Sequence, residues 1–154
     1  MIGGMVGNNS CGSNSVVYRS TREHLLEVKA FLSDGTEAVF SSLSTDEFHE
    51  KCELDSLEGN IYKTVRSILG NYDNQVEIRK EFPKKSVERR NTGYALDTVL
   101  EMSRFEEGIP FNLSKLIAGS EGTLCFVTEA KLQLLDLPPS QVAMVAVHAN
   151  TLQD

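Results

Sequence analysis

Alternation of apolar and polar positions gives the clearest structural signal, over residues 123–137. Leu124, Phe126 and every second residue to Asp136 form one mostly apolar face, and the positions between them are mostly polar beyond Val127. This period of two predicts a half-buried strand from Thr123 to Leu137. Before this strand, residues 113–117 carry apolar side chains at helical spacing and predict the end of a short helix.

A second alternating region predicts a β-hairpin. Residues 25–32 and 37–40 are rich in apolar side chains, and Ser33-Asp34-Gly35-Thr36 separates them. An Asp-Gly pair between alternating segments is typical of a tight turn that joins two antiparallel strands. We expect this unit to be structural.

The middle of the chain has helical spacing. Ser44 followed by Glu47 is the pattern of a capping box at a helix start. Residues 57–79 carry aliphatic side chains at helical intervals, with an interruption at Gly70-Asn71, and Pro83 ends this region. Together the elements predict an α+β fold, a small antiparallel sheet flanked by helices.

Two later segments are less sharply defined. A turn at residues 91–93 leads into an apolar strand or short helix through Leu100 and Met102. After Pro138-Pro139 has stopped the sheet, residues 141–148 predict one more apolar strand.

Two glycine-bearing segments are candidates for ligand binding through the main chain. Residues 3–15 hold four glycines, three asparagines and three serines, so their N–H groups are open to a phosphate-bearing ligand. The alternative is a flexible terminus. In Gly119-Ser120-Glu121-Gly122 the glycines allow a sharp turn and close approach to bare backbone. The alternative there is an ordinary loop between helix and strand.

The basic cluster of the chain lies between Lys80 and Arg90, with five cations against two acids. Arg89 and Arg90 are candidates for binding a carboxylate substrate, because a guanidinium offers paired hydrogen bonds. The alternative is a surface loop whose cations offset the acidic helix before it.

Composition narrows the function classes. A length of 154 residues allows one domain with a real core, and a net charge of -7 argues against a nucleic-acid partner. Apolar runs fall short of the roughly 18 residues of a membrane helix. Cys11, Cys52 and Cys125 fit reduced thiols in a cytoplasmic protein and match no metal-ligand spacing. A start inside a glycine-rich loop indicates a fragment of a longer chain.

The glycine segments taken together resemble a known family. GGMVGNNSCG at residues 3–12, with YRST at 18–21, and GSEGTL at 119–124, with TEA at 128–130, resemble the PCMH-type FAD-binding domain of flavoproteins related to vanillyl-alcohol oxidase. The match is better to the branch with glycolate, D-lactate and D-2-hydroxyglutarate dehydrogenases and alkyl-dihydroxyacetone-phosphate synthase. RRNTGYALD, at residues 89–97, also resembles large bacterial members that carry a C-terminal iron–sulfur domain.

The resemblance implies that residues 1–138 are the second subdomain of an FAD-binding domain and that 139–154 begin a truncated cap domain. Arg19 and Cys125 stand where the family usually has glycine, so the backbone conformation at Arg19 is in question. We expect the bend at Asn8–Gly12 and the bend at Gly119–Thr123 to converge on one dinucleotide cavity. The implied FAD-contacting residues are Gly3, Gly4, Asn8, Asn9, Ser10, Cys11 and Gly12, and Gly119, Ser120, Glu121, Gly122, Thr123, Leu124, Cys125, Phe126 and Val127.

By the same resemblance, the complete enzyme oxidises a small 2-hydroxy acid by hydride transfer to flavin. In that family the catalytic base lies largely in the cap domain, so the catalytic residue is unknown from this chain. The first FAD subdomain and any iron–sulfur region are also missing, so we expect the isolated chain to show no turnover and to bind FAD weakly or not at all. We expect a cytoplasmic protein, and the complete enzyme can associate peripherally with a membrane. The alternatives are the FAD half-domain of a sugar oxidase or alkyl-phosphate synthase, and a cofactor-free interaction module.

Overall fold

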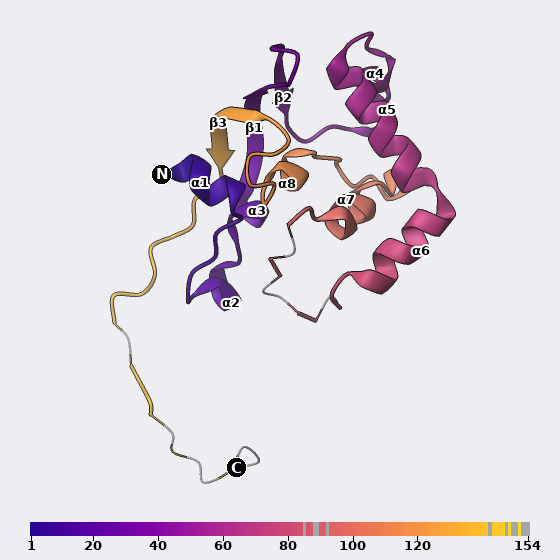
Figure 1. Ribbon diagram of the computed structural model, residues 1–154. Helices are drawn as coiled ribbons and strands as arrows, with labels where there is room; N and C mark the ends of the chain where they lie inside the picture. Colours follow the sequence, from indigo (N-terminus) through magenta and orange to yellow (C-terminus); the bar gives the residue numbers. More distant parts are fainter. Residues whose placement is uncertain are drawn as a thin grey trace.

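The computed structural model describes residues 1–84, 86, 87, 90, 91, 93–141, 143–146, 148 and 151 (Figure 1). A small sheet carries short helices at the N-terminal end of the chain, and longer helices lie to one side of it. The elements are α1 Ile2–Gly7, α2 Ser15–Tyr18, α3 Thr21–His24, β1 Leu25–Phe31, β2 Glu37–Phe40, α4 Thr45–Glu53, α5 Leu57–Gly70, α6 Tyr72–Glu81, α7 Leu96–Met102, the 3-10 helix η1 Phe105–Glu107, α8 Ser114–Ile117 and β3 Phe126–Leu132.

The sheet is antiparallel with strand order β2-β1-β3, which confirms the predicted α+β class. The predicted hairpin is confirmed as β1 and β2. At its turn Gly35 has a φ of 82°, and the Asp34 carboxylate accepts from the Thr36 backbone N–H at 2.9 Å. Glycine adopts this left-handed backbone at no steric cost, so the Asp-Gly pair determines where the chain reverses.

Strand β3 is shorter than predicted, and the predicted inward face is wrong over its first half. Lys29 pairs with Glu129 but Ala30 pairs with Val127, so Thr128 is an extra residue that bulges from the ladder. A bulge exchanges the two faces of a strand. Val127 therefore turns partly inward, and Phe126 is left 72% exposed.

The helical predictions for the middle of the chain are confirmed. Ser44 and Glu47 form the capping box of α4. The break at residues 70–71 separates α5 from α6, because the Asn71 side chain accepts from the Asn74 N–H and caps the new helix. The apolar segment after Gly93 is the helix α7, which decides between the strand and helix alternatives.

An aromatic cluster joins the longer helices to the chain that leads into α8. The Phe48 ring, on α4, lies 4.6 Å from the Phe111 ring and 5.7 Å from the Tyr62 ring between centroids. All three side chains are at most 1% exposed. Leu43 and Phe111 also exchange two backbone hydrogen bonds. Each such aromatic contributes about 1.5–3 kcal/mol by burial, so the segment before α8 is firmly anchored.

The two ends of the chain differ from prediction. The sequence indicates a glycine-rich loop at the start of the chain, but Ile2–Gly7 is helical, and Val6 and Asn9 are completely buried. Among the described residues after β3 there is no strand, so the strand predicted at 141–148 is absent from the part of that segment that is described. Assignment of 139–154 to a cap domain stays a prediction. In the described part of the chain, no helix has the length and apolar character to cross a membrane.

Candidate functional site

The two glycine segments meet directly through their backbones. The Gly119 N–H donates to the Val6 carbonyl at 3.0 Å, and the Glu121 N–H donates to the Gly7 carbonyl at 2.9 Å. The C-terminal end of α1 is thereby fixed against the 119–122 bend. The N-terminal segment and this bend therefore meet, although the two hydrogen bonds come from Val6 and Gly7, just before the predicted Asn8–Gly12 bend.

The 119–122 bend is tight because three of its residues have a positive φ. Gly119 has 88°, Gly122 has 75° and Glu121 has 54°. The Ser120 carbonyl accepts from both the N–H and the hydroxyl of Thr123, at 3.0 and 2.6 Å. The glycines were predicted to allow this turn, whereas the left-handed conformation of Glu121 had no sequence signal.

A cavity of about 350 Å³ opens between α1 and this bend. Its walls combine glycine backbone on the α1 side with the start of β3 on the other. Nine residues predicted to contact FAD line it: Gly3, Gly4, Asn8, Ser120, Glu121, Gly122, Cys125, Phe126 and Val127. The other lining residues are Val6, Gly7 and Ile117.

The remaining predicted contact residues lie outside this cavity lining. Leu124 lines an adjacent apolar cavity of about 290 Å³, which Cys125 also borders. Asn9 is buried behind the bend, next to Gly119. The residues absent from the lining are Asn9, Ser10, Cys11, Gly12, Gly119, Thr123 and Leu124.

The supply of main-chain donors is smaller than the glycine content implied. Most amides of the 119–123 bend already donate to carbonyls within the chain. Those of Gly122, Leu124 and Cys125 have no acceptor among the described residues. Burial raises the pKa of the Cys125 thiol, so this side chain is neutral at pH 7. The main-chain donors without an acceptor in the described part of the chain are therefore the amides of residues 122, 124 and 125, just before β3.

Arg19 keeps a backbone conformation typical of glycine. Its φ is 64° and its ψ is -163°. The backbone at Arg19, which the sequence left in question, therefore has a positive φ although the residue carries a side chain. A non-glycine residue in this region costs about 1–3 kcal/mol, which the surrounding structure must offset.

Arg22 holds three segments of the site together through hydrogen bonds, and nothing in the sequence pattern indicated this role. Its side chain is 5% exposed and donates to three main-chain carbonyls. Those are Lys115 at 2.9 Å, Gly93 at 2.6 Å and Ala118 at 2.6 Å. Burial lowers the pKa of the guanidinium. One cation thus ties α3, the 93–94 turn and the end of α8 together.

Lys115 and Asn9 complete this buried network. The Lys115 ammonium donates to the Arg22 carbonyl at 2.9 Å and to the Leu25 carbonyl at 2.6 Å. Burial lowers the Lys115 pKa. The Asn9 side-chain oxygen accepts from the Arg22 N–H at 2.8 Å and from the Ser20 hydroxyl at 3.0 Å. Only the packing of distant segments reveals these partners, so no local pattern signals them.

Tyr94 links the basic segment to the 119–122 bend. Its hydroxyl lies 2.6 Å from the Thr123 hydroxyl oxygen. The Gly93 carbonyl is one of the acceptors of Arg22. The segment that includes residues 93 and 94 therefore contacts the bend both directly, through Thr123, and through Arg22.

The two arginines predicted to bind substrate have different outcomes. Arg89 lies outside the described residues. Arg90 forms an ion pair with Asp97 on α7 and lines a second cavity, of about 530 Å³, between α6 and α7. That cavity shares no lining residue with the one beside α1. Arg90 does not line the cavity at the bend. Its position therefore gives no support to the substrate role that was predicted for it.

Comparison with known proteins gives one consistent result. The chain is 32% identical to a D-2-hydroxyglutarate dehydrogenase of Pseudomonas putida over 154 residues, which is 99% of this chain and 14% of that protein. It is 34% identical to the Escherichia coli protein of the same name over 137 residues, 89% of this chain and 13% of that one. The D-2-hydroxyglutarate dehydrogenase of Haemophilus influenzae is 33% identical over 141 residues, which is 89% of this chain and 13% of that protein.

The chain therefore spans about one seventh of the length of these curated relatives. Their names confirm the predicted resemblance to 2-hydroxy-acid dehydrogenases. No protein-family model matches the chain, and no solved structure matches it. The assignment to the second FAD subdomain stays a prediction.

Proposed function

We propose that this chain forms one wall of the FAD site of a dehydrogenase that oxidises a small 2-hydroxy acid of the D-2-hydroxyglutarate type. The observation that carries the proposal is the pair of backbone hydrogen bonds that joins α1 to the 119–122 bend around one cavity. The similarity to D-2-hydroxyglutarate dehydrogenases supports the choice of substrate class.

The cavity beside α1 has features that suit a dinucleotide. A Cβ placed on Gly3 or Gly4 would meet nothing within 4 Å, so these glycines leave open backbone at the cavity. The free amides of Gly122 and Cys125 supply hydrogen-bond donors to a phosphate or a flavin ring edge. Phe126 adds an exposed aromatic face beside them.

The size of this cavity explains why the chain supplies only part of the cofactor site. Cavities that enclose a drug-sized ligand measure about 300–1,000 Å³, and a value of about 350 Å³ is small for a whole dinucleotide. We expect the rest of the FAD surface to be covered by the subdomain that this chain lacks. The isolated chain should bind FAD weakly and purify without it.

When bound, FAD supplies the hydride acceptor for oxidation of the hydroxy acid. The residues of this chain would hold and orient it: main-chain donors at the start of β3 on one side and the glycine face of α1 on the other. Arg22 fixes the bend that carries those donors. No described residue of the chain is assigned to proton abstraction, which belongs to the complete enzyme.

The experiment compares this chain with a protein that also contains the remaining regions. Both are purified, their flavin is measured by absorbance near ~450 nm, and D-2-hydroxyglutarate, D-lactate and glycolate are each added anaerobically. We expect bleaching of the longer protein's flavin, fastest with D-2-hydroxyglutarate, and no flavin in the short chain. A flavin-free longer protein, or one reduced by none of these acids, contradicts the proposal.

A Cys125→Gly variant of the longer protein tests this wall specifically. Glycine at this position removes a side chain that borders the cavity. We expect FAD to bind more tightly, because the approach to the Cys125 amide becomes less hindered. Cys52→Ala is the matched control, because this thiol is buried away from the cavity. Equal FAD affinity in the two variants would argue against contact at Cys125.

A further inference from the structure

The cavity between α6 and α7 has a chemistry of its own. Its volume of about 530 Å³ exceeds that of the cavity beside α1, and the two have no lining residue in common. A ligand here would not lie against the wall proposed for FAD. The cavity needs an explanation that does not involve the flavin.

The charged side chains of this cavity are cationic overall. Four cations face two acids in its lining, although the chain as a whole has a net charge of -7. Such a local reversal of charge favours anions over the rest of the surface. The charged lining residues are Arg79, Lys84, Arg90, Arg104, Asp97 and Glu101.

Only part of this positive charge is neutralised. Arg90 pairs with Asp97, and Arg104 forms two ion pairs, with Glu101 at 2.8 Å and with Glu107 at 3.2 Å. Arg79 donates to the neutral side-chain oxygen of Gln75 at 3.2 Å. The Lys84 ammonium has no hydrogen bond or ion pair with any residue that the structure describes, whereas the Lys84 backbone carbonyl accepts from the Val87 N–H at 2.9 Å. Within the described part of the chain, the Arg79 guanidinium and the Lys84 ammonium therefore have no anionic partner.

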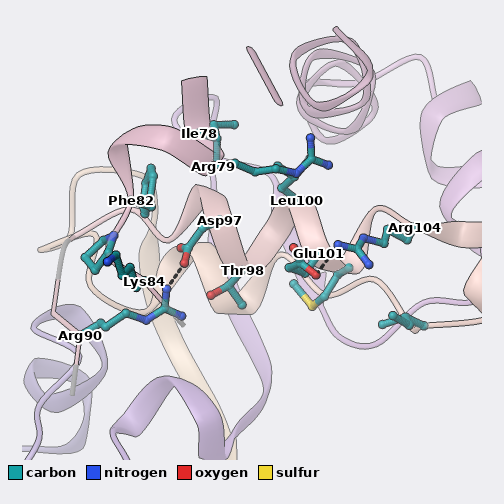
Figure 2. A pocket seen from close by; sticks show the side chains of 13 residues that line it. Ile78, Arg79, Phe82, Lys84, Arg90, Asp97, Thr98, Leu100, Glu101 and Arg104 are labelled. Carbon is teal, nitrogen blue, oxygen red and sulfur yellow. Dashed lines mark hydrogen bonds and ion pairs between the residues drawn. The ribbon is translucent and has the colours of Figure 1, made fainter. Parts of the chain in front are cut away.

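The cations lie at two separate ends of the cavity. Figure 2 shows Lys84 and Arg90 on one side, Arg79 and Arg104 on the other, and Thr98 between them. Apolar side chains make up much of the rest of the lining. They are Ile78, Phe82, Leu100, Met102 and Ile109.

We propose that this cavity binds a small organic dianion, a dicarboxylate whose two acid groups are joined by an apolar chain. Guanidinium and ammonium groups at the two ends bind the carboxylates by charge-assisted hydrogen bonds. The apolar lining covers the hydrocarbon chain between them. This cavity shares no lining residue with the one beside α1, so the proposal does not rest on the proposed function.

The test titrates the 154-residue chain with linear dicarboxylates from malonate to suberate, followed by amide shifts in two-dimensional NMR. The monocarboxylate of equal carbon number and inorganic phosphate are the reference anions. We expect one dicarboxylate length to bind about tenfold more tightly than its monocarboxylate, the gain of one further charge-assisted contact. The shifted amides should lie in α6 and α7.

Variants at each end complete the test. Arg79→Gln and Lys84→Gln should each weaken that dicarboxylate by about tenfold. Arg66→Gln, an exposed change on α5 outside the cavity, should leave it unchanged. Circular dichroism checks that each variant is folded. The proposal is overturned if phosphate or the monocarboxylate binds as well, if Arg66→Gln weakens binding equally, or if no dicarboxylate shifts these amides.

Discussion

Gly119 offers the sharpest test of how the bend is held, because its surroundings are fully specified. A Cβ at this position would lie 2.6 Å from the Nη2 atom of Arg22 and 3.0 Å from the Gly93 carbonyl oxygen. Gly122 is three residues away in the same bend, with a similar φ of 75°, yet a Cβ there would meet nothing within 4 Å. The two alanine variants therefore share a backbone cost and differ in the contact with Arg22.

The magnitudes follow from these two contributions. An alanine with a left-handed backbone costs about 1–2 kcal/mol, and both variants should lose this much. Gly119→Ala must also displace the buried guanidinium and lose one of its charge-assisted hydrogen bonds, worth about 1.5–3 kcal/mol. We expect a total loss of about 2.5–5 kcal/mol for Gly119→Ala. Typical domains have only about 5–15 kcal/mol of stability.

The assay is urea unfolding of the chain and both variants, followed by circular dichroism and by tyrosine fluorescence. Both probes must give one transition for the free energies to be compared. We expect Gly119→Ala to be less stable than Gly122→Ala by about 1.5–3 kcal/mol. Equal losses in the two variants would refute the claim that Arg22 fills the space beside Gly119.

Three further predictions concern the framework. Gly59→Ala should lower the free energy of unfolding by about 1–3 kcal/mol, because the new Cβ would lie 2.1 Å from the C-cap carbonyl of α4. This loss outweighs the better helix propensity of alanine. Gly70→Ala is the control, because a Cβ there meets nothing within 4 Å, and it should not lower the free energy of unfolding. Tyr62→Phe should raise the free energy of unfolding by about 1 kcal/mol, because the buried hydroxyl has no partner among the described residues. A lower free energy of unfolding in urea would contradict this. Hydrogen bonds from Ser44 hold the pKa of Glu47 below 4.5, so the stability that Glu47 adds is complete above pH 4.5 and is lost as pH falls through the lower folded value. The difference between the unmodified chain and Glu47→Gln should therefore shrink in acid, and a constant difference would refute the capping role.

Local signals in the sequence were sufficient for much of the fold. The Asp34-Gly35 turn, the capping box at Ser44 and the break at Gly70 each depend on a few neighbouring residues. Propensity and capping act over the same short range, so a single sequence reveals them. The glycine-bracketed bend before β3 belongs to this group as well.

The features that escaped prediction depend on distant partners. Arg22 looks like an ordinary surface cation in the sequence, and only the packing of α8 and the 93–94 turn against it makes it a buried donor. The bulge at Thr128 has no local marker, yet it reverses the exposure of Phe126. The glycines of α1 suggested a loop because helix propensity disfavours them, but contact with the bend overrides that preference.

The most direct test of the central claim is an NMR titration of the isotope-labelled chain with FAD at millimolar concentration. The account predicts weak, fast-exchange binding, with the largest shifts at the amides of Gly122, Leu124 and Cys125 and at the glycines of α1. Amides of α6 and α7 should stay unchanged. Shifts centred on α6 and α7, or none at the bend and α1, would contradict the claim that these two segments form one wall of a flavin site.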